Sequence, residues 1–190
     1  FAALAKERSG ILKEHGLDED EFVLVTVHRD NNTDDAQRLN DIFRTLLDLH
    51  ARHGLAFVLP VHPRTRKMMD KLLVPDVQEA LKRSPRFLLV PPAGFLDMIA
   101  LESAARLVVT DSGGVQKEAY FFGKPGVVLR PETEWVELVQ HGQAILADAD
   151  PVRIIAGFEG FLRNGIPDIP PLFGDGHAAE RICDELLRPW

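Results

Sequence analysis

Residues 106–122 read RLVVTDSGGVQKEAYFF, and they carry the clearest structural signal in the chain. The segment opens with an apolar run over 106–110, which is typical of a buried strand, and continues into a helical pattern over 115–122. Gly113 and Gly114 lie between the two parts, where they permit unusual dihedral angles and close approach to the backbone. A buried strand followed directly by a helix is the repeating unit of α/β proteins.

The same alternation of short apolar runs and helical patterns extends in both directions from this segment. We predict strands at 22–27, 55–59, 87–90, 106–110, 126–129 and 144–146. We predict helices at 1–8, 34–53, 65–73, 96–105, 115–122, 131–141, 151–162 and 178–187, and a loop at 164–171. Repeated strand–helix units predict a Rossmann-like, doubly wound parallel sheet, and the length of 190 residues suits one domain over 1–190.

Composition excludes several classes of protein. A formal net charge of −7 argues against a general nucleic-acid-binding protein, which would present a basic face. No apolar run approaches the roughly 20 residues that a membrane helix needs, so no membrane association is expected. The single Cys183 cannot form a disulfide within the chain, which suits a reducing compartment, and we expect a cytoplasmic protein.

Ligands of doubly wound sheets bind beyond the carboxyl ends of the strands, and Asp111-Ser112-Gly113-Gly114 lies at such an end. Free amides at the start of the following helix, together with its dipole, suit a diphosphate. Ser112 can cap that helix and donate to a phosphate oxygen, and Glu118 can accept hydrogen bonds from ribose hydroxyls. The alternative is a simple tight turn followed by a solvated helix.

Two weaker signals follow other strands. His28-Arg29 comes directly after the strand at 22–27, and His62 begins the basic segment 62–67 after the strand at 55–59. Each suits an anion at the same rim of the sheet, and each is equally well explained as a solvated loop or first helical turn. The other histidines show no pattern of metal ligands, so no metal site is predicted.

Together these segments resemble the non-hydrolysing UDP-N-acetylglucosamine 2-epimerases, whose fold is that of the GT-B glycosyltransferases. The resemblance covers almost the whole chain and aligns it with the C-terminal half of that fold. It is carried, in order, by Val25 to Arg29, His62 to Arg66, Gly94 to Asp97, Thr110 to Ala119, Gly123 to Pro125, Arg130 to Glu137 and Gly174 to Ala178.

The resemblance implies inversion at C2 of UDP-N-acetylglucosamine, or of a related diacetamido UDP-sugar, through elimination and re-addition of UDP. It implies no metal or redox cofactor. By match, Ser112, Gly113 and Gly114 would hold the diphosphate and Glu118 the ribose. His28 would assist the leaving UDP as the catalytic residue of this half. The remaining residues expected at the UDP site are Arg29, His62, Ala93, Phe95, Met98 and Trp135, with the segment 93–98 facing the uracil.

Three positions depart from the family pattern. Asn31 stands where the family usually carries Glu, and Met98 stands where many members place a Phe, so a thioether contact would replace stacking on the uracil. Trp135 follows Thr133-Glu134 where the N-acetylglucosamine enzymes usually have Arg. The Thr-Glu-Trp form is more similar to epimerases that act on diacetamido uronic-acid nucleotides.

The family's acid–base carboxylates lie in an N-terminal Rossmann domain that this chain does not match. We therefore expect that domain as a partner, a possible homodimer formed through it, and no epimerisation by the 190-residue chain alone. Three alternatives remain open: the donor-binding domain of a GT-B glycosyltransferase, a hydrolysing epimerase that releases UDP, and a non-catalytic UDP-sugar-binding domain.

Overall fold

Six parallel strands form one sheet in the order β3-β2-β1-β4-β5-β6 in the computed structural model, which describes residues 1–168 and 170–188. Every neighbouring pair is parallel, and in the central pair Val23 of β1 lies opposite Leu107 of β4. The predicted doubly wound sheet is therefore confirmed. The strands are β1 (Phe22–Thr26), β2 (Ala56–Pro60), β3 (Phe87–Val90), β4 (Leu107–Thr110), β5 (Gly126–Val128) and β6 (Ala144–Leu146).

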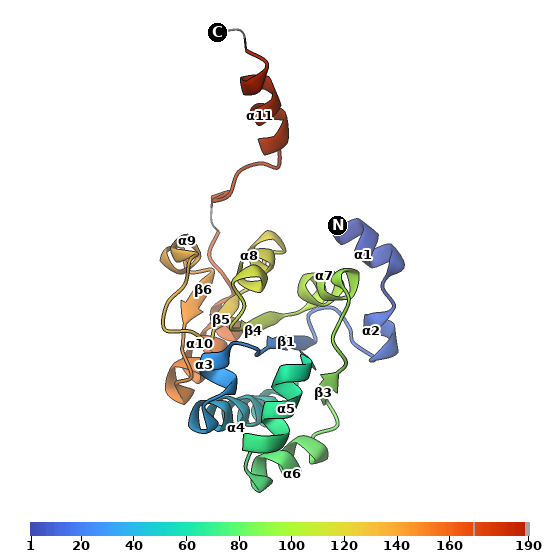
Figure 1. Cartoon of the computed structure of the whole chain (residues 1–190), viewed down its shortest axis with the longest axis vertical. Helices are drawn as coiled ribbons and strands as arrows, with labels where there is room; N and C mark the ends of the chain where they lie inside the picture. Colours follow the sequence, from blue (N-terminus) through green and yellow to red (C-terminus); the bar gives the residue numbers. More distant parts are fainter. Residues whose placement is uncertain (169, 189–190) are drawn as a thin grey trace.

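Helices cover both faces of this sheet (Figure 1). One hydrophobic cluster joins the sheet to α4 (Ala36–His53), α5 (Pro63–Leu72), α6 (Pro75–Arg83) and α10 (Pro151–Asn164). A second cluster joins the opposite face to α1 (Ala2–Arg8), α2 (Ile11–Glu14), α7 (Phe95–Ala104) and α8 (Gly113–Phe121). Neighbouring residues of β1 divide between the two clusters, because successive side chains of a strand point to opposite faces.

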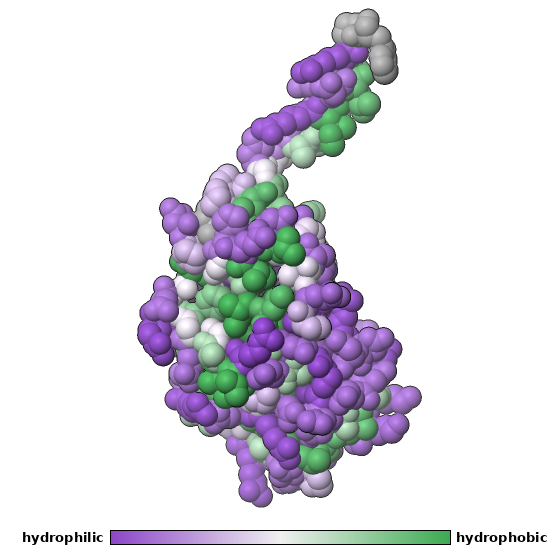
Figure 2. Space-filling model, turned by 90° about the vertical axis from the view of Figure 1, so that its left-hand side faces the viewer, coloured by the Kyte–Doolittle hydropathy of each residue, from purple (hydrophilic) through white to green (hydrophobic). Residues whose placement is uncertain are grey.

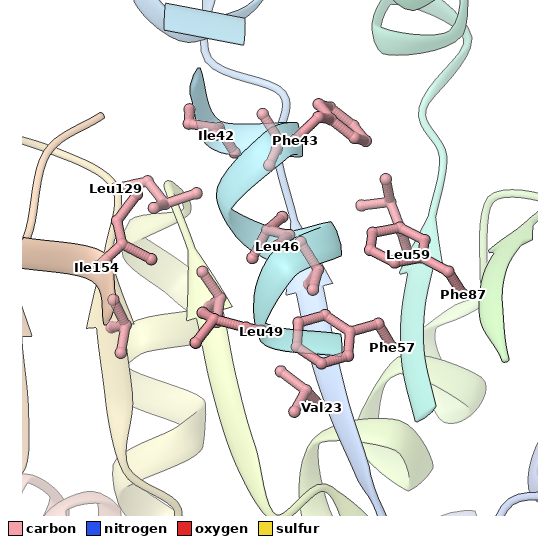
Figure 3. Close-up of a cluster of buried hydrophobic side chains, with 14 of the residues drawn as sticks. Val23, Ile42, Phe43, Leu46, Leu49, Phe57, Leu59, Phe87, Leu129 and Ile154 are labelled. Carbon is pink, nitrogen blue, oxygen red and sulfur yellow. The ribbon is translucent and has the colours of Figure 1, made fainter. Parts of the chain in front are cut away.

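The long helix α4 lies across the first face and supplies more buried residues to its core than any other helix (Figure 3). The carboxylate of Asp35 accepts a 3.0 Å hydrogen bond from the amide of Arg38 and begins the helix, and Gly54 ends it with a φ of 67°. Leu46 and Leu49 are fully buried and point at the strands beneath them. Their packing sets the position of β1 and its neighbours, and thus of the loops that leave the sheet.

Several helices differ from the sequence prediction. The predicted helix 131–141 is wrong over its first half, because α9 covers only Val136–Gln140. Three helices were not predicted: α2 (Ile11–Glu14), α3 (Asp30–Thr33) and α6 (Pro75–Arg83). The helix predicted at 115–122 begins earlier, at Gly113.

The C-terminal part contacts the domain through one short segment. The backbone amide of Leu172 donates a 2.8 Å hydrogen bond to the hydroxyl of Tyr120, and Phe173 packs edge-on against the same ring. Beyond it α11 (Ala178–Leu186) extends away from the domain, with hydrophobic residues gathered on one side (Figures 1 and 2). Residue 169, inside the predicted loop 164–171, lies outside the described residues. Among the described helices, none is long and apolar enough to cross a bilayer.

Candidate functional site

The strand order reverses between β1 and β4, and the predicted site lies beyond the carboxyl ends of these two strands. The hydroxyls of Thr26 and Thr110, the last residues of the two strands, are 2.5 Å apart. A cavity of about 260 Å³ opens above them. Five of the predicted site residues line it: His28, His62, Ala93, Met98 and Ser112.

Asp111 holds the loop that follows β1. Its side chain is fully buried, and its two oxygens accept hydrogen bonds from the backbone amides of His28 (3.1 and 3.0 Å) and Arg29 (3.0 Å). The Nδ1 atom of His28 lies 3.1 Å from the same carboxylate, so the Nε2 side of the imidazole is left for the cavity. Our sequence reasoning gave Asp111 no role, although a carboxylate at the end of an apolar strand was the available signal.

Asn32 and Arg38 complete the support behind Asp111. The amide nitrogen of Asn32 donates to Asp111 (3.1 Å) and to the carbonyl of Leu129 (2.9 Å). Arg38 donates to the side-chain oxygen of Asn32 (2.8 Å) and pairs with Asp148. This ion pair raises the pKa of Arg38 and lowers that of Asp148. Asn31, which stands where the family usually carries Glu, is exposed. Its neighbour Asn32 is the buried polar residue that contacts Asp111.

Helix α8 starts at the cavity. Ser112 is its N-cap, with the side-chain oxygen accepting from the amide of Val115 at 3.4 Å. The first amides of a helix have no intrahelical acceptor, so those of Gly113 and Gly114 are available to an anion. Neither glycine has a positive φ, so the predicted unusual dihedral angles are absent. The predicted close approach is present at Gly113, where a Cβ atom would lie 1.8 Å from Oε1 of Glu134.

Glu134 brings a negative charge to this helix start, and two arginines balance it. Its own backbone amide, opposed by partial burial, lowers the pKa of the Glu134 carboxyl, and Arg130 and Arg29 lower it further. Arg130 contacts the carboxylate at 2.7 Å. Because the Glu134 side chain is long and 44% exposed, it can move aside for an anion that the arginines would then share.

Trp135 fixes the backbone of the glycine pair. The indole nitrogen donates a 2.7 Å hydrogen bond to the carbonyl oxygen of Gly113. The ammonium of Lys117 lies 4.2 Å from the centre of the ring, on the helix that the bond anchors. The loop that replaces the first half of the predicted helix 131–141 thus covers the start of α8. Trp135 contributes there by holding the backbone carbonyl of Gly113.

Three of the predicted residues have further local contacts that describe their places. Glu118 is half-buried, and its Oε2 would lie 4.0 Å from a Cβ at Gly114, so the carboxylate turns back toward the start of α8. His62 caps α5 by accepting from the amide of Arg64 at 3.2 Å. Phe95 does not line the cavity: its ring is 57% exposed and packs edge-on against Phe1.

Two other results bear on the site. A second cavity of about 280 Å³, between α5, α6 and β3, contains none of the predicted residues. In the part of the chain that the structure describes, no cluster of three or more His, Cys, Asp or Glu side chains could hold a metal ion. The absence of a metal from the reaction therefore stays a prediction.

Comparison with known proteins links this geometry to one family. The family model described as UDP-N-acetylglucosamine 2-epimerase matches residues 2–187. A UDP-2,3-diacetamido-2,3-dideoxy-D-glucuronate 2-epimerase from Pseudomonas aeruginosa is 42% identical over 99% of this chain and 49% of its own length.

Solved structures agree with this result. The UDP-GlcNAc 2-epimerase of Methanocaldococcus jannaschii, in complex with UDP-GlcNAc and UDP, is 30% identical with a TM-score of 0.84, over 97% of this chain and 50% of that one. The UDP-GlcNAc 2-epimerase of Neisseria meningitidis, bound to UDP-GlcNAc, is 27% identical with a TM-score of 0.78, over 98% and 51%. The chain thus spans about half the length of these relatives, and its sheet matches one half of their GT-B fold. Matched from residue 2 to 187, this chain belongs to the UDP-N-acetylglucosamine 2-epimerase family.

Proposed function

We propose that this chain is the C-terminal, UDP-binding domain of an enzyme that inverts C2 of a UDP-sugar, with a diacetamido uronic acid as the sugar. Two observations support that choice of sugar. The Pseudomonas aeruginosa relative, at 42% identity, acts on such a nucleotide. The sequence Thr133-Glu134-Trp135 departs from the N-acetylglucosamine enzymes in the same direction.

The diphosphate binds at the start of α8. The observation that carries this proposal is the convergence, at one rim of the sheet, of a glycine-paired helix start with Ser112, Arg29 and Arg130. Backbone amides and the helix dipole attract a phosphate, and guanidinium groups neutralise its charge without needing a metal. A net charge of −7 does not oppose this, because the attraction is local.

The nucleoside lies across α7 and α8. Glu118 accepts hydrogen bonds from the ribose hydroxyls, since its carboxylate turns toward Gly114. Ala93 and Met98, in the cavity lining, contact the uracil, and Phe95 reaches it only by leaving Phe1. Met98 provides a polarisable, adaptable surface for an aromatic base.

His28 and Arg29 act on the leaving group. When the bond between C1 and the diphosphate breaks, its electron pair goes to the departing oxygen of UDP. Asp111 orients His28 and holds the Arg29 amide, so both residues are kept at the rim where the departing oxygen gains charge. Removal and return of the C2 proton require carboxylates within hydrogen-bonding reach, and these come from the N-terminal domain, which also forms the dimer. The proposal includes a cytoplasmic location, which the exposed thiol of Cys183 suits.

Titration of the chain with UDP tests the binding site. Ser112→Ala and Glu118→Ala should each weaken binding about tenfold or more, because each loses a hydrogen bond to or from a charged group worth roughly 1.5–3 kcal/mol. The matched controls are Glu79→Ala, in the remote helix α6, and Ser84→Ala, directly after that helix. Both should leave the affinity for UDP unchanged. Unchanged affinity in both site variants would remove the assignment.

Two measurements test the reaction. The chain alone should not exchange the C2 proton of a diacetamido UDP-uronate with deuterated water, because it lacks the acid–base carboxylates. Joined to an N-terminal epimerase domain, it should exchange that proton and leave an added acceptor sugar unmodified. Transfer to the acceptor would instead identify a glycosyltransferase, and steady release of UDP a hydrolysing epimerase.

A further inference from the structure

Glu102 is a buried acid that neither the fold nor the proposed chemistry explains. It lies in α7, its exposed fraction is 1%, and within the described residues no N–H or O–H group donates to either of its carboxyl oxygens. An ionised carboxylate in such a place is strongly unfavourable unless it is paired. Burial is the main reason that the pKa of Glu102 rises to about 9, and the charge of Glu118 adds to it.

The position of Glu102 connects it to the cavity. Met98, which lines the cavity, precedes Glu102 by four residues and so shares its face of α7. That helix packs against α8, where Val115 also lines the cavity and Glu118 follows about one turn later. Glu102 therefore lies directly behind the surface that would receive the nucleoside.

Helix α8 packs against α7, and the carboxyl of Glu118 lies close enough to that of Glu102 to raise the pKa of Glu102. Two ionised carboxylates both accept, so this contact becomes a hydrogen bond only when one of them carries a proton. Glu102 is the more deeply buried of the two, and burial favours the proton on the more buried carboxyl. Three helices pack against α7, and their charged residues are Lys6, Glu7, Arg8, Lys13, Glu14, Lys117 and Glu118. Of these, Glu118 is the residue whose charge raises the pKa of Glu102.

We propose that Glu102 is a positioning residue, whose protonated carboxyl donates a hydrogen bond to the carboxylate of Glu118 and holds it at the start of α8 to receive the ribose hydroxyls. The identity of the ligand rests on the proposed function above. A neutral acid suits this task, because it supplies a donor without adding negative charge beside a diphosphate site. A lysine would instead neutralise the carboxylate that must accept from the ribose.

The test compares UDP with 2′-deoxy-UDP as titrants of the chain and its variants. Glu102→Met removes the donor but keeps a buried side chain of similar length. We expect it to weaken UDP about tenfold and 2′-deoxy-UDP by a smaller factor, because one of the two hydroxyls that Glu118 binds is absent from the second ligand. Glu102→Gln keeps a donor and should preserve the preference for UDP. Glu79→Met, an exposed substitution, is the control.

Carboxyl-carbon NMR supplies a readout that does not depend on UDP. One glutamate should titrate near pH 9, should be missing from the spectrum of Glu102→Gln, and should titrate at lower pH in Glu118→Gln. A folded Glu102→Met that keeps both affinities and their ratio overturns the proposal. If that variant does not fold, the absence of a high-pH glutamate from the wild-type spectrum overturns it. If the wild-type chain does not bind UDP, the proposed function is contradicted instead. The NMR titration then still tests whether Glu102 carries a proton beside Glu118.

Discussion

Replacing Glu102 by Gln should stabilise the domain, and by an amount that grows with pH. The folded state keeps a proton on Glu102 up to a pKa of about 9, whereas an exposed glutamate releases it near 4.5. Between these values the folded state binds more protons than the unfolded state, so the free energy of unfolding falls as pH rises. Gln resembles the neutral acid and does not titrate, so the variant escapes this loss.

The size of this stability difference follows from how far the pH lies above the pKa of the unfolded state. Each pH unit above 4.5 costs the wild-type chain up to about 1.4 kcal/mol. At pH 7 the variant should therefore be more stable by about 3 kcal/mol, and the two chains should be equally stable near pH 4.5. Burial at 1% exposure is the reason that solvent does not screen the effect away.

Urea denaturation of both chains at pH 5, 6, 7 and 8 measures this difference. Other titrating groups are common to the two chains and cancel in the comparison, provided that the m-values agree. Glu79→Gln serves as the control: Glu79 is exposed and the pKa of its carboxyl is lowered by Lys82, so its removal should not stabilise the chain. A stability difference that stays constant from pH 5 to pH 8 would refute the reasoning.

Three further substitutions test the support of the site and the core. Asp111→Asn should cost roughly 2–4 kcal/mol and weaken UDP binding, because an amide presents a donor to the 28–29 amides; urea denaturation and UDP titration measure the two effects. Trp135→Phe removes the hydrogen bond to Gly113 but keeps an aromatic ring; it should destabilise the chain by about 1 kcal/mol and weaken UDP binding severalfold, and unchanged affinity would limit Trp135 to packing. Leu46→Ala should lower the free energy of unfolding, measured by heat or urea, by about 2–5 kcal/mol, because Leu46 is fully buried on the side of α4 that faces away from solvent. It should leave the affinity for UDP intact.

The predicted strands illustrate what local patterns can show. All six are present close to the predicted positions, because strands buried on both faces must be continuous apolar runs. The helix at 75–83 was missed, since Pro75 and Pro85 near its ends favour interruption in a purely local reading. The first half of the helix at 131–141 was wrong, because Thr133 and Trp135 donate side-chain hydrogen bonds to α8.

The candidate site divides in the same way. Ser112, His28 and His62 could be predicted because their places follow from strand ends, and all three line one cavity. Asp111 could not be given its role, because the amides that it binds are 83 and 82 residues away in the chain. Glu102 looks like an ordinary polar interruption of an apolar helix until α8 is packed against it.

Sequence alone therefore determined the strand–helix alternation, the parallel sheet and the glycine-paired helix start, since hydrophobic periodicity and glycine placement act over a few residues. Only the tertiary structure decided which groups meet: Asp111 under the loop after β1, Trp135 on the carbonyl of Gly113, and Glu102 behind Glu118. These contacts join residues distant in the chain, and burial by the whole domain gives them their strength, because hydrogen bonds and charges gain or cost most where water is excluded.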